Sequence, residues 1–549
     1  SPFRDAVDEA VRAIQAEKDR TAGNQVQILD DGDDALLIRI HLIRQASRSI
    51  CLQTFIWTND ETGRFVMYEL IEAAKRGVKV RIIADHFVSD KDPEVVAFLA
   101  TVHPNLEIRH YRPAASRIKP PWYRTAGDLL LGYRNFNQRM HNKILLVDDV
   151  AVITGGRNIE NTYFNRSTGM NFRDRDILVV GPAAADARVS FEKYWNCRHV
   201  VPSQNLLDVA QIIRAGTFRR FATFADFATN GLCDRENREA SDDAVIRQRF
   251  VDRLVRANRV KFVADKPGKN RAIGLYGGGR INQHLAAAMR EAESEVIVQS
   301  PYFVLGIPSR RFFASLKKAH PDLRVVVSTN SFGSTDNIMA YSANYRLRSA
   351  YIEGLGIESY EFKPYPADLH RIFPAFDHFA MQAEEKIHRG EQSRGPFLCI
   401  HAKSAVFDGR TAYVGSYNLD PRSANLNTEV GFLIADETIA LQLRATILGD
   451  CLPENSWVIA KRRMPLSADR LNGMVEGLMM LSPIDLWPIR NTTSFELIPG
   501  KPPVPPGHPD FHANYRESGE FPGAPEGLSM KQITTHLFKT VGPIAVNIL

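Results

Sequence analysis

The pattern of apolar and polar positions in the first part of the chain predicts alternating helices and strands. Residues 35–46 place apolar side chains at the three- and four-residue spacing of one helix face, and residues 49–57 form a nearly continuous apolar run. A second helical pattern at 65–77 is followed by a second, β-branched run at 78–85. Strands that alternate with helices predict βαβ units and a mostly parallel sheet.

The same order of elements returns in the second part of the chain. Four segments repeat it, at 281–292, 295–304, 310–319 and 323–330. Gln53 and Gln299 fall at matching places in paired strands, and residues 106–113 match 357–364 in pattern. A repeat of about 250 residues is too long for a solenoid. We therefore expect an internal duplication that gives two similar α/β domains.

Changes in composition divide the chain further. We predict five parts, namely an N-terminal helical segment at 1–25, a first domain at 26–215, a connector at 216–275, a second domain at 276–455 and a C-terminal tail at 456–549. The connector is interpreted as a helix with loops, and its basic run 266–271 as a surface loop. The glycines at 277–279 precede a helix but lack the Lys-Ser/Thr of a P-loop, so a phosphate cradle is not favoured.

Each half also carries the same rare arrangement of polar residues. The first copy comprises His141, Lys143, Asp148, Gly155, Gly156 and Asn158, and the second comprises His401, Lys403, Asp408, Gly415, Ser416 and Asn418. Both fit the pattern H-x-K-x(4)-D-x(6)-G-[GS]-x-N. A single H-x-K carries a high risk of chance occurrence. Two full copies at equivalent places of a duplicated fold indicate a functional site, because sequence and fold then agree at two levels.

The local sequence predicts how each copy folds. Apolar residues between the lysine and the aspartate indicate a strand, on which His and Lys two positions apart share a face. A short turn after the aspartate and a returning strand would bring the G-[GS]-x-N segment back beside the His-Lys pair.

These residue types suit chemistry on a phosphodiester. Two lysines can neutralise the equatorial oxygens of an anionic phosphorus centre, and one imidazole can attack it while the other moves a proton. A catalytic imidazole usually needs a partner for its second ring nitrogen. Glu429 begins a strand after His401, and Asp176 occupies the corresponding place after His141, with Asp174 as the alternative.

The paired motif resembles the signature of the phospholipase D superfamily. Four segments resemble the C-type bacterial cardiolipin synthases more closely, at 74–85, 139–164, 171–182 and 413–432. The resemblance spans roughly residues 25–450. One departure is Gly156, where serine is common in the family and where Ser416 stands in the other copy.

The resemblance implies a fold and a mechanism. It implies two α/β/α sandwich domains with the active site at their interface, and a two-step phosphatidyl transfer that uses no metal or other cofactor. In the superfamily the first histidine is usually the nucleophile, here His141, and His401 is then the general acid and base. Lys143, Lys403, Asp148 and Asp408 complete the catalytic motifs.

The resemblance also implies substrates and a location. We predict that the protein makes cardiolipin from phosphatidylglycerol and a second phospholipid, either phosphatidylglycerol or phosphatidylethanolamine, at a membrane of the bacterial cell envelope. Hydrolytic phospholipase D activity is the nearest alternative, because water competes with the acceptor alcohol. A nuclease on the same fold is less favoured, since no basic strip interleaved with aromatic residues suits a nucleic acid. A non-catalytic scaffold is disfavoured by two complete motifs.

Composition narrows these choices only slightly. The 549 residues argue for two or more domains, and the apolar and charged fractions of 44% and 24% are typical of a globular protein. A net charge of +6 suits anionic partners without choosing between lipid and nucleic acid. No apolar run is long enough for a transmembrane helix. Because the chain begins with Ser1, we expect that a preceding segment, such as a signal or anchor, was removed.

Two further features leave alternatives open. The tail contains the cations Lys461, Arg462 and Arg463, an apolar stretch at 473–487, a proline-rich run at 501–509 and an apolar end at 535–549. It either packs across the domains or lies partly on a membrane surface. The five cysteines are Cys51, Cys197, Cys233, Cys399 and Cys451. Their spacing predicts unpaired structural thiols and leaves one disulfide open.

Overall fold

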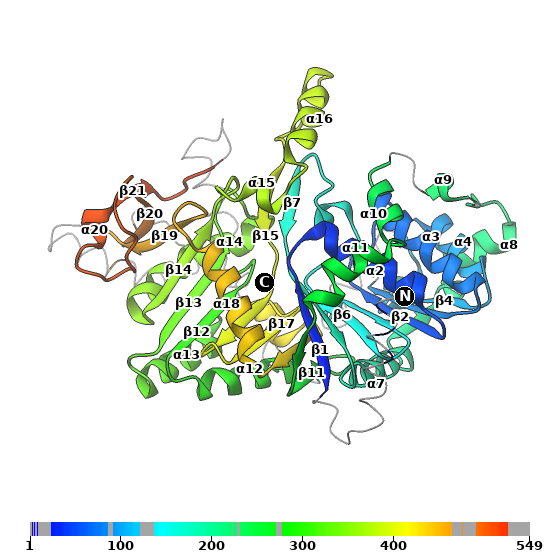
Figure 1. Ribbon diagram of the computed structural model, residues 1–549, viewed down its shortest axis with the longest axis horizontal. Helices are drawn as coiled ribbons and strands as arrows, with labels where there is room; N and C mark the ends of the chain where they lie inside the picture. The colour runs from blue at the N-terminus through cyan, green and yellow to red at the C-terminus, as the bar shows by residue number, and fades with distance from the viewer. Residues whose placement is uncertain are drawn as a thin grey trace.

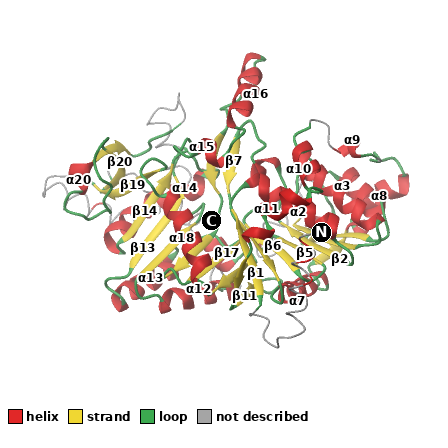
Figure 2. Cartoon of the chain, viewed as in Figure 1, coloured by secondary structure: helices red, strands yellow, loops and turns green. Residues whose placement is uncertain are grey.

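Two mixed sheets lie side by side with helices packed against them, as Figure 2 shows. The computed structural model describes residues 23–85, 92–120, 137–221, 223–227, 231–270, 277–463 and 490–524, with a few isolated positions besides. The arrangement confirms the predicted duplication of an α/β unit. The helical segment predicted at 1–25 lies almost wholly outside the described residues.

The first sheet has nine strands in the order β10-β1-β8-β6-β5-β2-β3-β4-β9. Its strands are β1 (Asn24–Leu29), β2 (Ser49–Thr54), β3 (Lys79–Asp85), β4 (Leu106–Tyr111), β5 (Ile144–Val147), β6 (Ala151–Gly155), β8 (Asp176–Val180), β9 (Val200–Pro202) and β10 (Val255–Ala257). Among these described strands, β2–β3 and β3–β4 are parallel and the other neighbours are antiparallel. The prediction of a mostly parallel sheet was therefore wrong. Helices link the parallel neighbours β2, β3 and β4, whereas β5 and β6 form a tight antiparallel hairpin.

Helices cover both faces of the first sheet. Helices α2 (Gly32–Gln45) and α3 (Glu61–Lys75) share a core with Leu145 and Val147 of β5. Helix α7 (Ala184–Trp195) packs on the opposite face, against Leu146 and its neighbours. Successive residues of a strand point to opposite faces, so β5 is buried on both sides and reads as a continuous apolar run.

The second sheet repeats this plan with ten strands in the order β11-β18-β17-β16-β12-β13-β14-β19-β20-β21. Its strands are β11 (Val260–Ala264), β12 (Glu295–Gln299), β13 (Arg324–Asn330), β14 (Ile357–Phe362), β16 (Ser404–Phe407), β17 (Thr411–Gly415), β18 (Val430–Ile434), β19 (Ser456–Lys461), β20 (Thr492–Leu497) and β21 (Tyr515–Gly519). The larger helices are α12 (Arg280–Glu291), α13 (Ile307–Ala319), α14 (Ile338–Ser349), α16 (Phe376–His388) and α18 (Glu437–Asp450). Helix α18 occupies the place that α7 has in the first domain.

The two domains share one apolar core. Phe191 of α7 and Ile177 of β8 belong to the same buried cluster as Phe432 of β18 and Leu443 of α18. Helix α7 contacts β11 of the second sheet, and α18 contacts β1 and β10 of the first. A separate two-stranded parallel sheet, β7 (Met170–Arg173) with β15 (Phe397–Ile400), also joins the domains, as Figure 1 shows.

The predicted connector is packed rather than separate. Helix α8 (Leu207–Ala215), the last element before the connector, contacts α4 (Pro93–Thr101). Within the connector, α9 (Phe224–Phe227) and α10 (Asp234–Glu239) contact α3 and α2 respectively, and α11 (Asp243–Arg249) follows them. Strand β10 then joins the first sheet and β11 the second. The remaining described elements are η1 (Ala114–Ser116), η2 (Asn161–Phe164), η3 (Ser203–Asn205), η4 (Val251–Arg253), η5 (Ala350–Gly354), α15 (Leu369–Ile372), α17 (Pro421–Asn425) and α20 (Phe511–Asn514).

The described part of the tail packs onto the second domain. Strands β19, β20 and β21 extend its sheet, and two of the predicted cations are paired, Lys461 with Glu353 at 3.0 Å and Arg462 with Glu517 at 2.9 Å. The apolar stretches at 473–487 and 535–549 lie outside the described residues apart from one position. Among the described helices, none is long and apolar enough to cross a membrane. All five cysteines are unpaired, as predicted.

Candidate active site

Each domain pairs a short stretch of backbone with the other domain immediately before an H-x-K motif. The β7–β15 pairing continues past β15, where the His401 N–H donates to the Arg173 carbonyl at 2.9 Å. In the other motif Met140 forms a parallel bridge with Thr428, and the His141 N–H donates to the Thr428 carbonyl at 3.0 Å. Each motif is therefore held beside an acidic residue of the opposite domain. The motifs precede strands β5 and β16 rather than lying on them, which corrects the predicted local structure.

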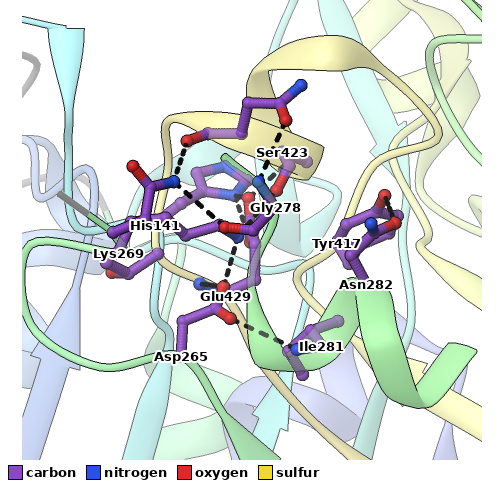
Figure 3. A network of polar contacts seen from close by, with 12 residues as sticks. His141, Asp265, Lys269, Gly278, Ile281, Asn282, Tyr417, Ser423 and Glu429 are labelled. Carbon is purple, nitrogen blue, oxygen red and sulfur yellow. Dashed lines mark hydrogen bonds and ion pairs between the residues drawn. The ribbon is translucent and has the colours of Figure 1, made fainter. Parts of the chain in front are cut away.

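His141 lies against Glu429 in a buried site (Figure 3). Its Nδ1 is 2.9 Å from Oε2 and 3.1 Å from Oε1 of the carboxylate. The Ser416 hydroxyl donates to Oε2 at 2.5 Å and the Ser423 hydroxyl to Oε1 at 2.8 Å. Burial, and then the charge of Lys143, hold the pKa of His141 well below its usual value, while burial raises the pKa of Glu429 to about 7. At neutral pH a neutral imidazole with its proton on Nδ1 fits this contact and leaves the Nε2 lone pair free.

His401 lies against Asp174 in the same manner. Its Nδ1 is 2.6 Å from Asp174 Oδ2 and 2.7 Å from Lys403 Nζ. Burial alone would raise the pKa of Asp174, but the adjacent His401 and Lys403 hold it below its usual range. We assign Nδ1 as the donor to Asp174, since an ionised carboxylate only accepts. Burial lowers the pKa of His401 to about 4, and the rings of Tyr163 and Phe172 wall it at centroid distances of 5.1 and 4.7 Å.

The pairing of histidines with acids is crossed between domains. The sequence suggested Glu429 as the partner of His401, and Asp176, or alternatively Asp174, as the partner of His141. The structure shows that Glu429 contacts His141 and that Asp174 contacts His401. Both within-half assignments were therefore wrong, because the backbone pairing that holds each motif comes from the other domain.

Sheet register explains why Asp174 replaces Asp176. Gly155 lies opposite Asp176 in the first sheet, and Gly415 lies opposite Gly431 in the second. Residues two positions earlier than Asp176 and Gly431 are therefore equivalent, and these are Asp174 and Glu429. Counting along the sequence could not reveal this, because the two halves differ in the length of the loop before this strand.

Asp176 has a structural role instead. Its Oδ2 accepts hydrogen bonds from Arg39 of α2 at 2.8 Å and from Arg157 at 3.1 Å, and the Asp176 side chain is fully buried. Arg157 belongs to the Gly-Gly-Arg-Asn segment, so this ion pair fixes that segment on the first domain. Loss of one partner would leave a buried charge uncompensated.

Two residues that the sequence reasoning missed hold the backbone before each motif. Asp85, the last residue of β3, accepts from the Arg139 side chain at 2.7 Å and from the Met140 N–H at 2.9 Å. Asn330, the last residue of β13, accepts from the Ile400 N–H at 2.7 Å and donates to its carbonyl at 2.8 Å. Their matching places at the ends of the duplicated strands were the available signal.

The two motif lysines are both buried and have lowered pKa values. Lys143 and Lys403 each donate through Nζ to the carbonyl of the histidine in their own motif, His141 and His401. Burial lowers the pKa of Lys143 to about 7, with Lys403 as the next cause, and burial lowers that of Lys403 to about 8. The charge of Lys403 also lowers the pKa of both His141 and Lys143, so it acts across from the second motif to the first. An anion bound between the two amino groups would raise their pKa values and so favour their protonated, positively charged form.

Asp148 and Asp408 lie outside this site, contrary to the catalytic role predicted for them. Asp148 accepts from the N–H groups of residues 47–49, at 2.7 to 2.8 Å. Asp408 accepts from the N–H groups of residues 293–295, each at 2.9 Å. Both have positive φ, at 51° and 52°, in the turn between the two strands that follow each motif. Each one ties that turn to the start of the neighbouring strand β2 or β12.

The two asparagines of the motifs differ in their contacts. Asn158 accepts from the Ile56 N–H at 3.1 Å and donates to the Tyr163 hydroxyl at 2.7 Å, so it positions a ring beside His401. The Asn418 N–H donates to the Ser423 hydroxyl at 3.2 Å. Its side-chain oxygen is buried and has no hydrogen-bond partner within the described structure.

Comparison with known proteins identifies the family. A family model described as "Cardiolipin synthase, PLD-like domain" matches residues 39–195 and 285–450, more than half of the chain. The chain belongs to this family. The resemblance inferred from the paired motifs is thereby confirmed, and the protein is an enzyme of the phospholipase D class.

Individual relatives of this cardiolipin synthase-like family cover most of the chain. "Cardiolipin synthase C" of Escherichia coli K12 is 29% identical over 425 residues, which are 75% of this chain and 81% of that protein. An uncharacterised protein of Helicobacter pylori is 32% identical over 422 residues, which are 76% of this chain and 78% of that protein. A phosphatidylserine synthase structure from Haemophilus influenzae Rd KW20 shares the fold, with a TM-score of 0.50 and 15% identity over 79% of this chain and 87% of that one.

Proposed function

We propose that the protein transfers a phosphatidyl group from one phospholipid to the hydroxyl group of another and so makes cardiolipin. Phosphatidylglycerol is the proposed acceptor, and the donor is a second phosphatidylglycerol or phosphatidylethanolamine. The observation that carries this proposal is the pair of buried histidines, each held by an acid of the opposite domain and each next to a buried lysine. The names of the relatives support phospholipids as the substrate class.

In the proposed first step, His141 Nε2 attacks the donor phosphorus. The bond from phosphorus to the headgroup oxygen breaks, and His401 gives that oxygen a proton, so glycerol or ethanolamine leaves. Glu429 stabilises the positive charge that develops on the ring of His141. Lys143 and Lys403 neutralise the phosphoryl oxygens in the transition state.

In the second step, the acceptor hydroxyl attacks the phosphohistidine. His401, now neutral, takes the proton of that hydroxyl while the phosphorus–nitrogen bond breaks and His141 is regenerated. The low pKa of about 4 for His401 describes the site without substrate. A bound phosphodiester adds a negative charge beside the ring and raises its pKa, as a general acid requires.

Mass spectrometry of lipids tests this function. The protein is incubated with phosphatidylglycerol vesicles, alone or with phosphatidylethanolamine, and the products are quantified. We expect cardiolipin together with free glycerol or ethanolamine. Phosphatidic acid without cardiolipin would show that the protein hydrolyses phospholipids rather than transferring phosphatidyl groups. Cleavage of nucleic acid without lipid turnover would reject both of these functions.

A location follows from the proposed substrates. Phospholipids with two acyl chains reside in bilayers, so we propose that the protein works at a membrane surface of the bacterial cell envelope. Partition of the protein into sedimented anionic vesicles tests this proposal, and recovery in the supernatant at all lipid concentrations would reject it.

A further inference from the structure

A buried ion pair of the connector lies next to Glu429, and Figure 3 shows both of its members. Lys269 Nζ is 2.5 Å from Asp265 Oδ2, and the two side chains are 0% and 1% exposed. This burial corrects, at Lys269, the prediction that residues 266–271 form a basic surface loop, of which position 271 lies outside the described residues. The neighbouring Lys266 does remain exposed, so the same short segment carries one buried and one solvated lysine.

Both members of the ion pair contact groups that hold Glu429. Asp265 Oδ2 accepts from the Glu429 N–H at 3.0 Å, and the Asp265 N–H donates to the Glu429 carbonyl at 2.9 Å. Lys269 Nζ donates to the Ser423 carbonyl at 2.9 Å, and the Ser423 hydroxyl donates to Glu429 Oε1. Asp265 Oδ1 also accepts from the Ile281 N–H at the start of α12. Residues of the connector therefore hold the backbone of Glu429 directly and its carboxylate through Ser423.

Position 279 has no room for a side chain beside the ion pair. A side chain at Gly279 would place its first carbon 2.4 Å from Lys269 Nζ and 2.5 Å from Asp265 Oδ1. Gly279, the last glycine of the run 277–279, therefore leaves room for this pair. The acid of His401 is supported differently, because Gly156 takes the place of Ser416 and Asp174 fills the space beside it.

We propose that Lys269 and Asp265 are positioning residues of the catalytic site, which fix the orientation of Glu429 against His141 and set the proton affinity of that pair through charges of opposite sign. The proposal deepens the proposed phosphatidyl transfer, since it concerns the histidine assigned as nucleophile. Buried charges act strongly on a neighbour, because little water screens them.

The charges around Glu429 set the sign of the expected effects. Charged or titratable groups that face it are His141, Lys143, Lys403, Lys269, Asp265, Asp420, Tyr413 and Tyr417. Lys269 lowers the pKa of Glu429, so its removal raises the proton affinity of the Glu429–His141 pair. Removal of the Asp265 charge leaves Lys269 uncompensated and lowers that affinity. The two variants therefore act in opposite directions.

The test measures total phosphatidyl cleavage against pH for the full chain with Lys269→Met, Lys269→Arg and Asp265→Asn. Lys269→Met should move the acidic limb of the profile of kcat/KM upward by about one pH unit, and Asp265→Asn should move it downward. Lys269→Arg should restore most of the wild-type profile. Lys266→Met is the matched control, because it removes the same charge from an exposed position of the same segment.

A purely structural role predicts a different result. It would lower activity equally at every pH, or shift both variants in the same direction, and either outcome overturns the proposal. If Lys269→Met does not fold, as judged by thermal unfolding, the downward shift expected of Asp265→Asn still decides. The titration of the His141 ring, followed by NMR of labelled histidine, gives the same shifts without any substrate. Failure of lipid transfer with intact shifts would therefore reject only the proposed function.

Discussion

The carboxylate of Asp174 occupies the space in which Gly156 would carry a side chain. A carbon added at Gly156 would lie 2.0 Å from Asp174 Oδ1, whereas Ser416 at the equivalent place donates to Glu429. The shorter acid and the missing side chain are therefore two parts of one arrangement. This explains the departure from the common family serine that the sequence showed at position 156.

Gly156→Ser should displace Asp174 from His401 and reduce activity by about tenfold or more, because a misplaced catalytic ring loses its orientation. The initial rate of headgroup release, normalised to folded protein, measures this loss. Gly449→Ser is the matched control, since a carbon added there meets no neighbouring atom within 4 Å. Equal rates for Gly156→Ser and the control would contradict the packing argument.

The two histidines should behave differently when they are replaced. His141→Ala should abolish covalent labelling of the protein by a phosphatidyl donor, because it removes the proposed nucleophile. His401→Ala should slow release of the label, so the phosphorylated protein accumulates in acid-quenched samples. Undiminished labelling of His141→Ala would move the nucleophile assignment to the other ring.

The crossed pairing predicts that each acid affects the histidine of the other domain. Glu429→Gln should slow formation of the phosphohistidine, and Asp174→Asn should slow the proton transfers of His401, each by about tenfold to a thousandfold. Rapid-quench measurement of the two steps separates these effects. Asp176→Asn serves as the comparison, because it breaks the buried pairs with Arg39 and Arg157 and should instead lower the melting temperature.

Asp148→Ala and Asp408→Ala should destabilise the fold by about 1–3 kcal/mol each while the folded enzyme keeps its specific activity. Urea unfolding and rate measurements on the same samples check both parts. Burial alone would raise the pKa of Asp408, but three backbone N–H donors lower it below its usual 3.8. Its stabilising contribution is therefore complete above that value and is lost as the pH falls through the lower folded value. A variant that is fully stable but inactive would return these residues to the catalytic group.

Prolonged treatment with EDTA should leave phosphatidyl cleavage within about twofold of the untreated rate. The proposed steps use imidazole and ammonium groups to move protons and neutralise charge. The assay compares dialysed protein with and without added Mg²⁺, Ca²⁺ or Zn²⁺. Loss of activity that a single metal restores would contradict the mechanism.

The duplicated helices and strands could be predicted from the sequence because apolar spacing reports which local structure buries a face. The matching positions of Gln53 and Gln299 in β2 and β12 illustrate this. Whether neighbouring strands are parallel or antiparallel was predicted less well, because strands joined by a hairpin and strands joined by a helix have similar apolar runs. The repeated motif also located both histidines and both lysines, because their spacing can be read directly from the sequence.

The partners of these residues could not be predicted in the same way. The contacts His141–Glu429 and His401–Asp174 depend on backbone pairing between residues that are far apart in the sequence. The burial of Lys269 depends on the packing of a connector whose composition is typical of a solvated loop. Such relationships arise from tertiary register, which the local sequence does not encode.

The apolar cluster shared by α7 and α18 restricts how the enzyme can move. Separation of the two halves would expose that cluster and break the β7–β15 pairing at the same time. A hinge motion that separates the two domains for each substrate would therefore cost a large free energy. We expect instead that the two domains stay together during turnover, so that the rate depends on entry and exit of substrate rather than on domain closure.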